Sequence, residues 1–118
     1  MTKLIDDLSA YGVDAKDVLE RFVGDEELYR DCLMLFVNDN AFSELGSALE
    51  CKDYTTAFEK AHLLKGVCAN LGLAVLLEKI CVLVETLRER KTEGLDEMYR
   101  AVIDSIEALR TILSCASE

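Results

Sequence analysis

The residues of this chain that could do chemistry gather around its only histidine, His62, in the stretch AHLLKGVCANLG. Lys65 follows three residues later, and Gly66 comes directly after it. A neutral imidazole nitrogen is a nucleophile near physiological pH, because the ordinary pKa of histidine is about 6.5. An ammonium group one helical turn away can stabilise phosphoryl oxygens. The three residues are therefore suited to carrying a phosphoryl group on His62.

Gly66 is the unexpected member of this group. A glycine inside a helix costs about 1 kcal/mol relative to alanine. We therefore expect Gly66 to let a partner approach closely beside His62. The alternative is that His62 is only a solvated side chain on a helix surface, and that Lys65 is solvated in the same way.

The elements that must position these residues are predicted to be helices. The chain contains no proline and only six glycines, which favours long uninterrupted helices over sheets with tight turns. Gly12, Gly24, Gly72 and Gly94 fall between segments of helical periodicity and mark their ends. Gly72 is expected to follow the last turn of the helix that carries His62.

Apolar residues recur at alternating spacings of three and four along each predicted helix. A first short helix is expected over Thr2–Tyr11, and a second begins after Asp14 and runs through Phe22. Asp25 is predicted to cap one long helix from Glu26 to about Leu49, and Asp53 is predicted to cap the next. The expected inward-facing residues of these two long helices are Leu28, Cys32, Leu35, Phe36, Phe42, Leu45 and Leu49, followed by Ala57, Ala61, Leu64, Cys68 and Leu71.

Two more helices complete the predicted fold, with inward stripes that begin at Leu73 and at Leu95. Their expected core residues are Leu73, Leu76, Leu77, Ile80, Leu83, Val84 and Leu87, then Leu95, Tyr99, Val102, Ile106, Leu109 and Leu113. Long amphipathic helices joined by short connections pack antiparallel to their neighbours. We therefore predict an all-α fold, an up-down-up-down antiparallel four-helix bundle with one or two short N-terminal helices covering one end.

Helical geometry turns His62 away from the predicted core. At about 100° per residue, His62 lies about 140° from the centre of the inward stripe formed by Ala57, Ala61 and Cys68. Residues three and four apart lie on the same side of a helix. The predicted outward patch comprises Phe58, His62, Lys65, Gly66 and Ala69, with Glu59 at its edge.

Composition narrows the classes of function. The 118 residues suit one domain, 1–118, and 51% of them are apolar, so the chain is expected to fold. A formal net charge of −10 argues against nucleic acid and against anionic membrane surfaces as partners. No apolar run approaches the roughly 20 residues of a membrane span, and the N-terminus lacks a signal peptide. These features predict a cytoplasmic protein. With five cysteines, no C-x-x-C pair and one histidine, we expect reduced thiols and no metal site.

The stretch AHLLKGVCANLGL resembles the histidine-containing phosphotransfer (HPt) domain of bacterial multistep phosphorelays. The family motif, H-x-x-K-G preceded by Ala and followed by a Leu-Gly pair, is met by Ala61, His62, Lys65, Gly66 and Leu71–Gly72. The stretch GDEELYRDCLMLFVND from Gly24 to Asp39 resembles the helix before the phosphorylated one. The small-residue turn at Cys51–Asp53 also fits. The resemblance extends from about Leu4 to Leu113.

The resemblance implies that His62 accepts a phosphoryl group from a phospho-aspartate on a receiver domain and passes it to another receiver. Lys65 would stabilise the phosphoryl group, and Gly66 would let the receiver approach. The expected partners are response-regulator receiver domains and a hybrid sensor histidine kinase. Phe58, Glu59 and Ala69 are expected to contact them. The carrier would be a monomer with no cofactor and no catalysis of its own, and Mg²⁺ would come with the receiver. The initial methionine and the absence of a linker favour a stand-alone carrier.

One position departs from the family pattern. Family members often place Gln or Glu on the following helix to support the second imidazole nitrogen, whereas Val84 occupies that position here. Other candidates facing His62 are Leu77, Ile80 and Cys81. Two further functions therefore stay open. One is a receiver-binding adaptor that does not use phosphorylation. The other is an enzyme that uses His62 as a base, which the lack of a nearby acid, serine or metal ligand disfavours.

Overall fold

The computed structural model describes residues 2–116, and this range contains seven helices. They are α1 (Lys3–Tyr11), α2 (Ala15–Arg21), α3 (Glu26–Val37), α4 (Ala41–Glu50), α5 (Tyr54–Asn70), α6 (Ala74–Arg88) and α7 (Leu95–Ala116). No strand occurs in that range, and the predicted all-α class is confirmed. None of the helices found there is both long enough and apolar enough to cross a membrane.

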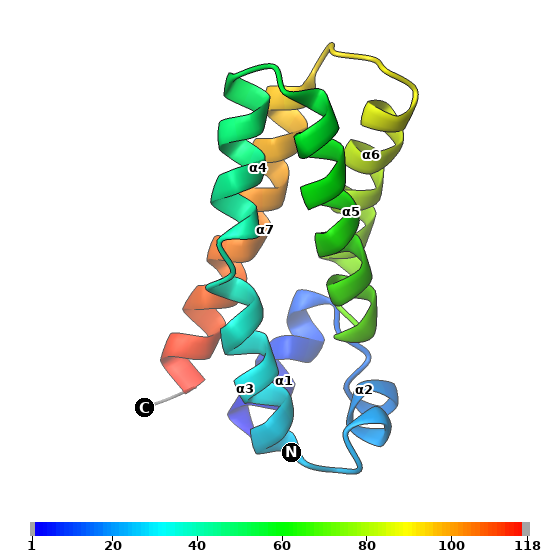
Figure 1. Cartoon of the computed structure of the whole chain (residues 1–118). Coiled ribbons are helices and arrows are strands. Elements are labelled where there is room, and N and C mark those ends of the chain that lie inside the picture. The colour runs from blue at the N-terminus through cyan, green and yellow to red at the C-terminus, as the bar shows by residue number, and fades with distance from the viewer. Residues whose placement is uncertain (1, 117–118) are drawn as a thin grey trace.

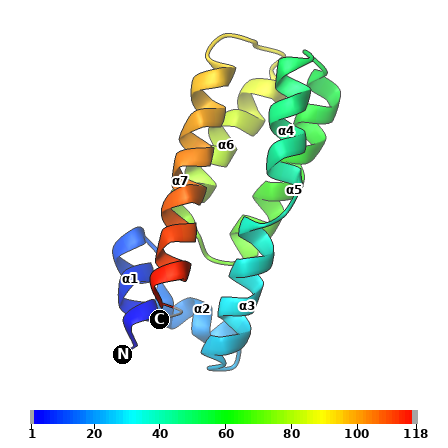
Figure 2. The same ribbon diagram turned by 90° about the vertical axis from the view of Figure 1, so that its left-hand side faces the viewer.

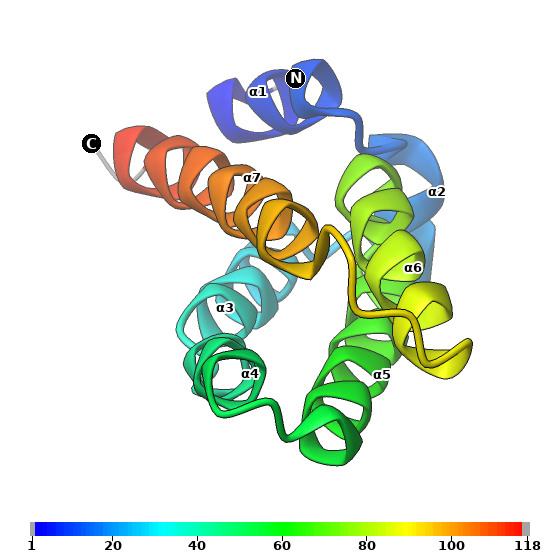
Figure 3. The same cartoon turned by 90° about the horizontal axis from the view of Figure 1, so that it is seen from above.

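Helices α4 to α7 run lengthwise through the molecule, and each reverses the direction of the one before it (Figure 1). Each also packs against the next, and α7 returns to lie against α3 and α4, as the view from above shows (Figure 3). The short helix α1 packs against α7 (Figure 2). The Tyr11 hydroxyl at the end of α1 donates a 3.0 Å hydrogen bond to the Ser105 carbonyl on α7. Helix α5, which carries His62, therefore lies between α4 and α6.

The prediction of one long helix from Glu26 to about Leu49 is wrong, because the chain forms two helices there with a break at residues 38–40. The Asp39 carboxylate accepts a 2.8 Å hydrogen bond from the backbone N–H two residues later, a local turn that competes with helix formation. The Val37 carbonyl at the end of α3 accepts a 3.2 Å hydrogen bond from Arg110 Nε on α7. A side-chain donor from α7 therefore satisfies a carbonyl at the end of α3, which has no partner within its own helix.

The buried face of α3 also differs from the predicted one. Leu28 and Leu35, both expected to face inward, are 48% and 75% exposed. Phe36 is buried as predicted, and the other buried residues of α3 are Tyr29, Leu33 and Val37. The Tyr29 side chain is fully buried, and its hydroxyl donates a 2.7 Å hydrogen bond to the Leu71 carbonyl. A buried tyrosine needs such an acceptor, and the sequence alone does not reveal that one is available.

The remaining inward stripes agree with the predicted ones. On α5, α6 and α7 the buried residues are Ala57, Ala61, Leu64, Cys68, Leu76, Ile80, Leu83, Val84, Leu87, Leu95, Val102, Ile106, Leu109 and Leu113, with Leu77 and Tyr99 half-buried. The predicted caps are also present, because Asp14 and Asp25 accept hydrogen bonds from the backbone N–H three residues later. The buried apolar residues of α5, α6 and α7 belong to one hydrophobic core, which α5 shares with both of its neighbours.

Candidate functional site

The helix that carries His62 begins at a side-chain cap. Asp53 accepts a 3.2 Å hydrogen bond from the Thr56 N–H, as predicted for an N-cap. Hydrogen bonds from the Thr56 side chain and backbone lower the pKa of the Asp53 carboxyl. The carboxylate is therefore ionised at neutral pH. Its negative charge also interacts favourably with the positive end of the helix dipole.

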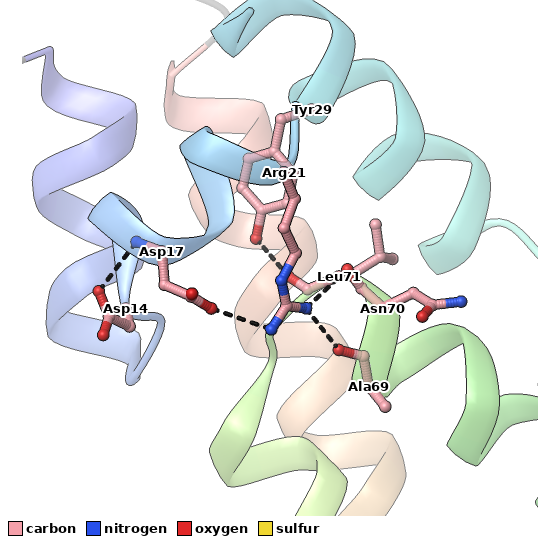
Figure 4. A network of polar contacts seen from close by, with 7 residues as sticks. All are labelled: Asp14, Asp17, Arg21, Tyr29, Ala69, Asn70 and Leu71. Atoms are coloured by element: carbon pink, nitrogen blue, oxygen red, sulfur yellow. Dashed lines mark hydrogen bonds and ion pairs between the residues drawn. The ribbon is translucent and has the colours of Figure 1, made fainter. Parts of the chain in front are cut away.

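The other end of α5 is held by residues from α2 and α3. The Arg21 guanidinium donates to the Ala69 and Asn70 carbonyls at 3.1 and 3.3 Å, and Tyr29 donates to the Leu71 carbonyl (Figure 4). Asp17 holds the same guanidinium through a 2.9 Å ion pair. The last carbonyls of a helix have no partner within the helix, so these bonds satisfy groups that solvent would otherwise have to satisfy.

The inward face of α5 is made of small and apolar residues. Ala57, Ala61, Leu64 and Cys68 have no exposed surface. Burial raises the pKa of the Cys68 thiol to about 12, so this cysteine stays protonated, and it donates to the Leu73 carbonyl at 3.5 Å. Cys68 is therefore a core residue, as expected from its position on the helix.

The outward face of α5 carries the predicted trio. His62 and Gly66 are exposed, and Lys65 is half-buried. Within residues 2–116 the Lys65 ammonium pairs with no carboxylate, so it is free to meet an anion. A Cβ atom built on Gly66 would meet no other atom within 4 Å. The space above Gly66 is therefore open, and no internal contact requires a glycine there.

The other predicted members of the patch lie on the same side of α5. Ala69 and Glu59 are exposed, and Phe58 is half-buried against the core. The Phe58 ring lies 5.8 Å from the His62 ring, centroid to centroid, with an interplanar angle of 33°. Helical spacing alone therefore brings all six predicted site residues to one face.

No neighbouring side chain supports the imidazole by a hydrogen bond in the part of the chain that the structure describes. Val84 and Ile80, two of the positions expected to face His62, are buried in the core with 0% and 1% exposure. Glu85 on α6 is exposed and pairs instead with Arg88, at 2.9 Å. The Phe58 ring lies beside the imidazole.

Arg88 is a neighbour of the site that sequence reasoning missed. Its Cζ atom lies 5.6 Å from the centroid of the Phe58 ring. Both residues line a groove of about 660 Å³ between the start of α5 and the end of α6, together with Arg90 and Lys91. Arg88 lies on a different helix, and no spacing in the sequence links it to Phe58. Within the described chain no group of three or more His, Cys, Asp or Glu residues is placed to hold a metal ion.

Comparison with protein-family models matches residues 37–112 to the Hpt domain. The match covers α4 to α6 and most of α7, including the whole of the helix that carries His62. Searches against curated proteins and against solved structures returned no match.

Proposed function

The chain belongs to the Hpt domain family, and on that premise we propose that it carries a phosphoryl group on His62 from one receiver-domain aspartate to another. Phosphorelay histidine phosphotransfer is the general function that membership implies. The observation that carries the assignment to His62 is the exposed imidazole with a free Lys65 ammonium and open space at Gly66 on one helix face.

In the proposed transfer, a neutral imidazole nitrogen of His62 attacks the phosphorus of a phospho-aspartate. The nitrogen–phosphorus bond forms, the bond from phosphorus to the aspartate oxygen breaks, and the aspartate leaves as a carboxylate. The second ring nitrogen keeps its proton throughout. Lys65 stabilises the phosphoryl oxygens, and a receiver that holds Mg²⁺ supplies the remaining positive charge. The chain needs no cofactor of its own in this scheme and acts as a carrier rather than an enzyme.

The proposed scaffold is an up-down-up-down bundle in which α3 and α4 together form the first long element. Phe58, Glu59 and Ala69 are proposed to contact the receiver around His62, because all three share its face of α5. We further propose that the chain acts as a cytoplasmic monomer that also receives phosphate from a hybrid sensor histidine kinase.

The test is phosphoryl uptake from a phosphorylated receiver encoded near the gene. The wild-type chain is expected to gain acid-labile, base-stable phosphate, and His62→Gln is expected to gain none. Lys65→Gln should slow uptake, whereas the same change at Lys79, on α6, serves as its matched control. Equal labelling of His62→Gln would assign the chemistry to another residue, and no labelling of the wild type would contradict the proposal.

A second candidate function is a receiver-binding adaptor that is not phosphorylated. The observation that favours it is that the imidazole has no hydrogen bond within the described residues, with the buried Val84 at the position where the family often has Gln or Glu. Receiver binding that is equal for the wild type and His62→Ala, combined with no labelling, would establish the adaptor function. Binding that comes with labelling at His62 would exclude it.

A further inference from the structure

We propose that Phe58 is a positioning residue for His62 and that Arg88 holds Phe58 in place from α6. The inference rests on the proposed function, because it concerns how the imidazole is oriented for transfer. In this inference an aromatic contact orients the imidazole, where a hydrogen bond from α6 would otherwise do so.

The first observation is how little holds the imidazole. His62 is exposed, and within residues 2–116 it has neither a hydrogen bond nor an ion pair. An exposed side chain with no partner exchanges between its staggered rotamers. Val84, buried in the core, has no polar atom to offer. Any restriction of the ring within this chain must therefore come from packing.

The second observation is the ring contact itself. Phe58 lies one helical turn before His62, with the ring centroids 5.8 Å apart and the planes tilted by 33°. Aromatic pairs favour centroid separations of about 4.5–7 Å. The contact removes one side of the imidazole from water and favours the rotamers in which the two rings meet.

The third observation is that Phe58 is itself held from a second helix. The Arg88 guanidinium lies 5.6 Å from the Phe58 centroid, within the roughly 6 Å range of a cation–π interaction. Glu85, on the same helix as Arg88, pairs with that guanidinium at 2.9 Å. The arrangement links α6 to the imidazole through the Phe58 ring, so in this proposal the orientation of His62 depends on Arg88 as well as on Phe58.

The direct test is NMR of the imidazole, whose signals need no further assignment because the chain has one histidine. The wild type should show nuclear Overhauser contacts between the His62 and Phe58 rings, and a ring-current shift of the imidazole protons. Phe58→Leu should remove both signals, and Phe58→Tyr should keep them. Arg88→Gln should weaken them, whereas Arg90→Gln makes the same charge change in the same groove without a ring contact and should leave them intact.

Transfer kinetics then test whether this orientation matters. From a phosphorylated receiver, Phe58→Leu should lower kcat about fivefold, in addition to any rise in KM from the proposed contact of Phe58 with the receiver, and Phe58→Tyr should restore kcat. Phosphoramidate is a small donor that needs no docking. In that reaction an imidazole nitrogen bonds to phosphorus, the phosphorus–nitrogen bond of the donor breaks, and ammonia leaves. Its rate should change by less than about twofold in Phe58→Leu, because a free donor can approach any rotamer.

The outcomes separate this inference from the proposed function. The absence of ring contacts between His62 and Phe58 in the wild type would overturn the positioning role even if His62 is phosphorylated. Equal effects of Arg88→Gln and Arg90→Gln on the imidazole signals would overturn it too. A fall in receiver transfer that appears only in KM, with kcat unchanged, would overturn it as well, because Phe58 would then serve docking alone. No phosphorylation from either donor would contradict the proposed function, while the NMR result would still decide the contact.

Discussion

Two glycines lie inside neighbouring helices, Gly46 on α4 and Gly66 on α5, and they differ in what surrounds them. A Cβ atom at Gly46 would lie 2.5 Å from the Tyr99 hydroxyl oxygen. A Cβ atom at Gly66 would meet nothing within 4 Å. Each glycine costs its helix about 1 kcal/mol relative to alanine. At Gly46 the close packing of α4 on α7 accounts for that cost, whereas at Gly66 nothing inside the molecule does.

The difference supports the proposal that Gly66 leaves room for a docked partner. Tyr99 lies over Gly46 because its hydroxyl donates a 2.9 Å hydrogen bond to the Phe42 carbonyl, one turn earlier on α4. Gly66 has no such neighbour and lies one turn after the exposed His62. An open position beside the proposed nucleophile fits the proposed close docking of a receiver. On this proposal, packing explains the glycine at position 46 and partner binding explains the one at position 66.

The largest effect is expected from Gly66→Gln. A long side chain there would fill the open space beside His62 and displace a docked receiver, and misplacement by about 1 Å can cost about 100-fold in rate. Transfer from a phosphorylated receiver should fall by about that factor. Circular dichroism should show little loss of helix content, because a Cβ atom at Gly66 clashes with no neighbouring residue. Unchanged transfer would remove the docking role of Gly66.

Gly46→Ala should have the next largest effect, this time on stability. Overpacking costs about 1–3 kcal/mol, and the higher helix propensity of alanine offsets about 1 kcal/mol of it, so we expect a net loss of up to about 2 kcal/mol. Chemical denaturation measures this change. In a Tyr99→Ala background the same substitution should become neutral or stabilising. An equal loss in both backgrounds would mean that Tyr99 is not the reason for Gly46.

Gly66→Ala should change stability in the opposite direction. With no clash to offset the gain in helix propensity, the free energy of unfolding should rise by about 0.5–1 kcal/mol. The same denaturation experiment compares it directly with Gly46→Ala. If Gly66→Ala destabilises the chain, an internal requirement for glycine exists at that position and the contrast between the two residues fails.

The smallest effect concerns the caps of the same two helices. Asn40, at the start of α4, makes no side-chain capping bond, whereas Asp53 caps α5 and has a lowered pKa. A carboxyl with a lowered folded-state pKa stabilises the fold above its ordinary pKa of about 3.9, and this contribution disappears as the pH falls through the folded value. Asparagine also caps helices, so Asp53→Asn tests the charge alone.

The expected result for Asp53→Asn is a Tm slightly below that of the wild type at pH 7, with the difference shrinking below pH 4. Thermal melts across this pH range measure it. Asn40→Ala is the matched variant on α4 and should change Tm little at any pH, because no side-chain cap is lost. A difference between Asp53→Asn and wild type that stays constant with pH would show that the charge of Asp53 does not stabilise α5.

Much of the site could be predicted because it lies on one helix. His62, Lys65 and Gly66 share a face through spacings of three and four, and the caps at Asp14, Asp25 and Asp53 act within three residues. The prediction was wrong where distant contacts override local pattern. The break at residues 38–40 combines a local hydrogen bond at Asp39 with a donor from Arg110 on α7. The rotated face of α3 includes Tyr29, which bonds to the Leu71 carbonyl. The family match covers residues 37–112. This range is shorter than Leu4–Leu113, the range over which the motifs resemble the family.

By itself the sequence determined that the chain is helical, where most helices begin and end, and that His62 faces outward beside Lys65 and Gly66. The physical reason is that helical periodicity and capping are local properties of the chain. Only the tertiary structure decided that Arg88 reaches Phe58, that Arg21 and Tyr29 hold the end of α5, and that Gly46 is covered while Gly66 is open. Such contacts depend on how each helix rotates and slides against its neighbours, which no local spacing specifies.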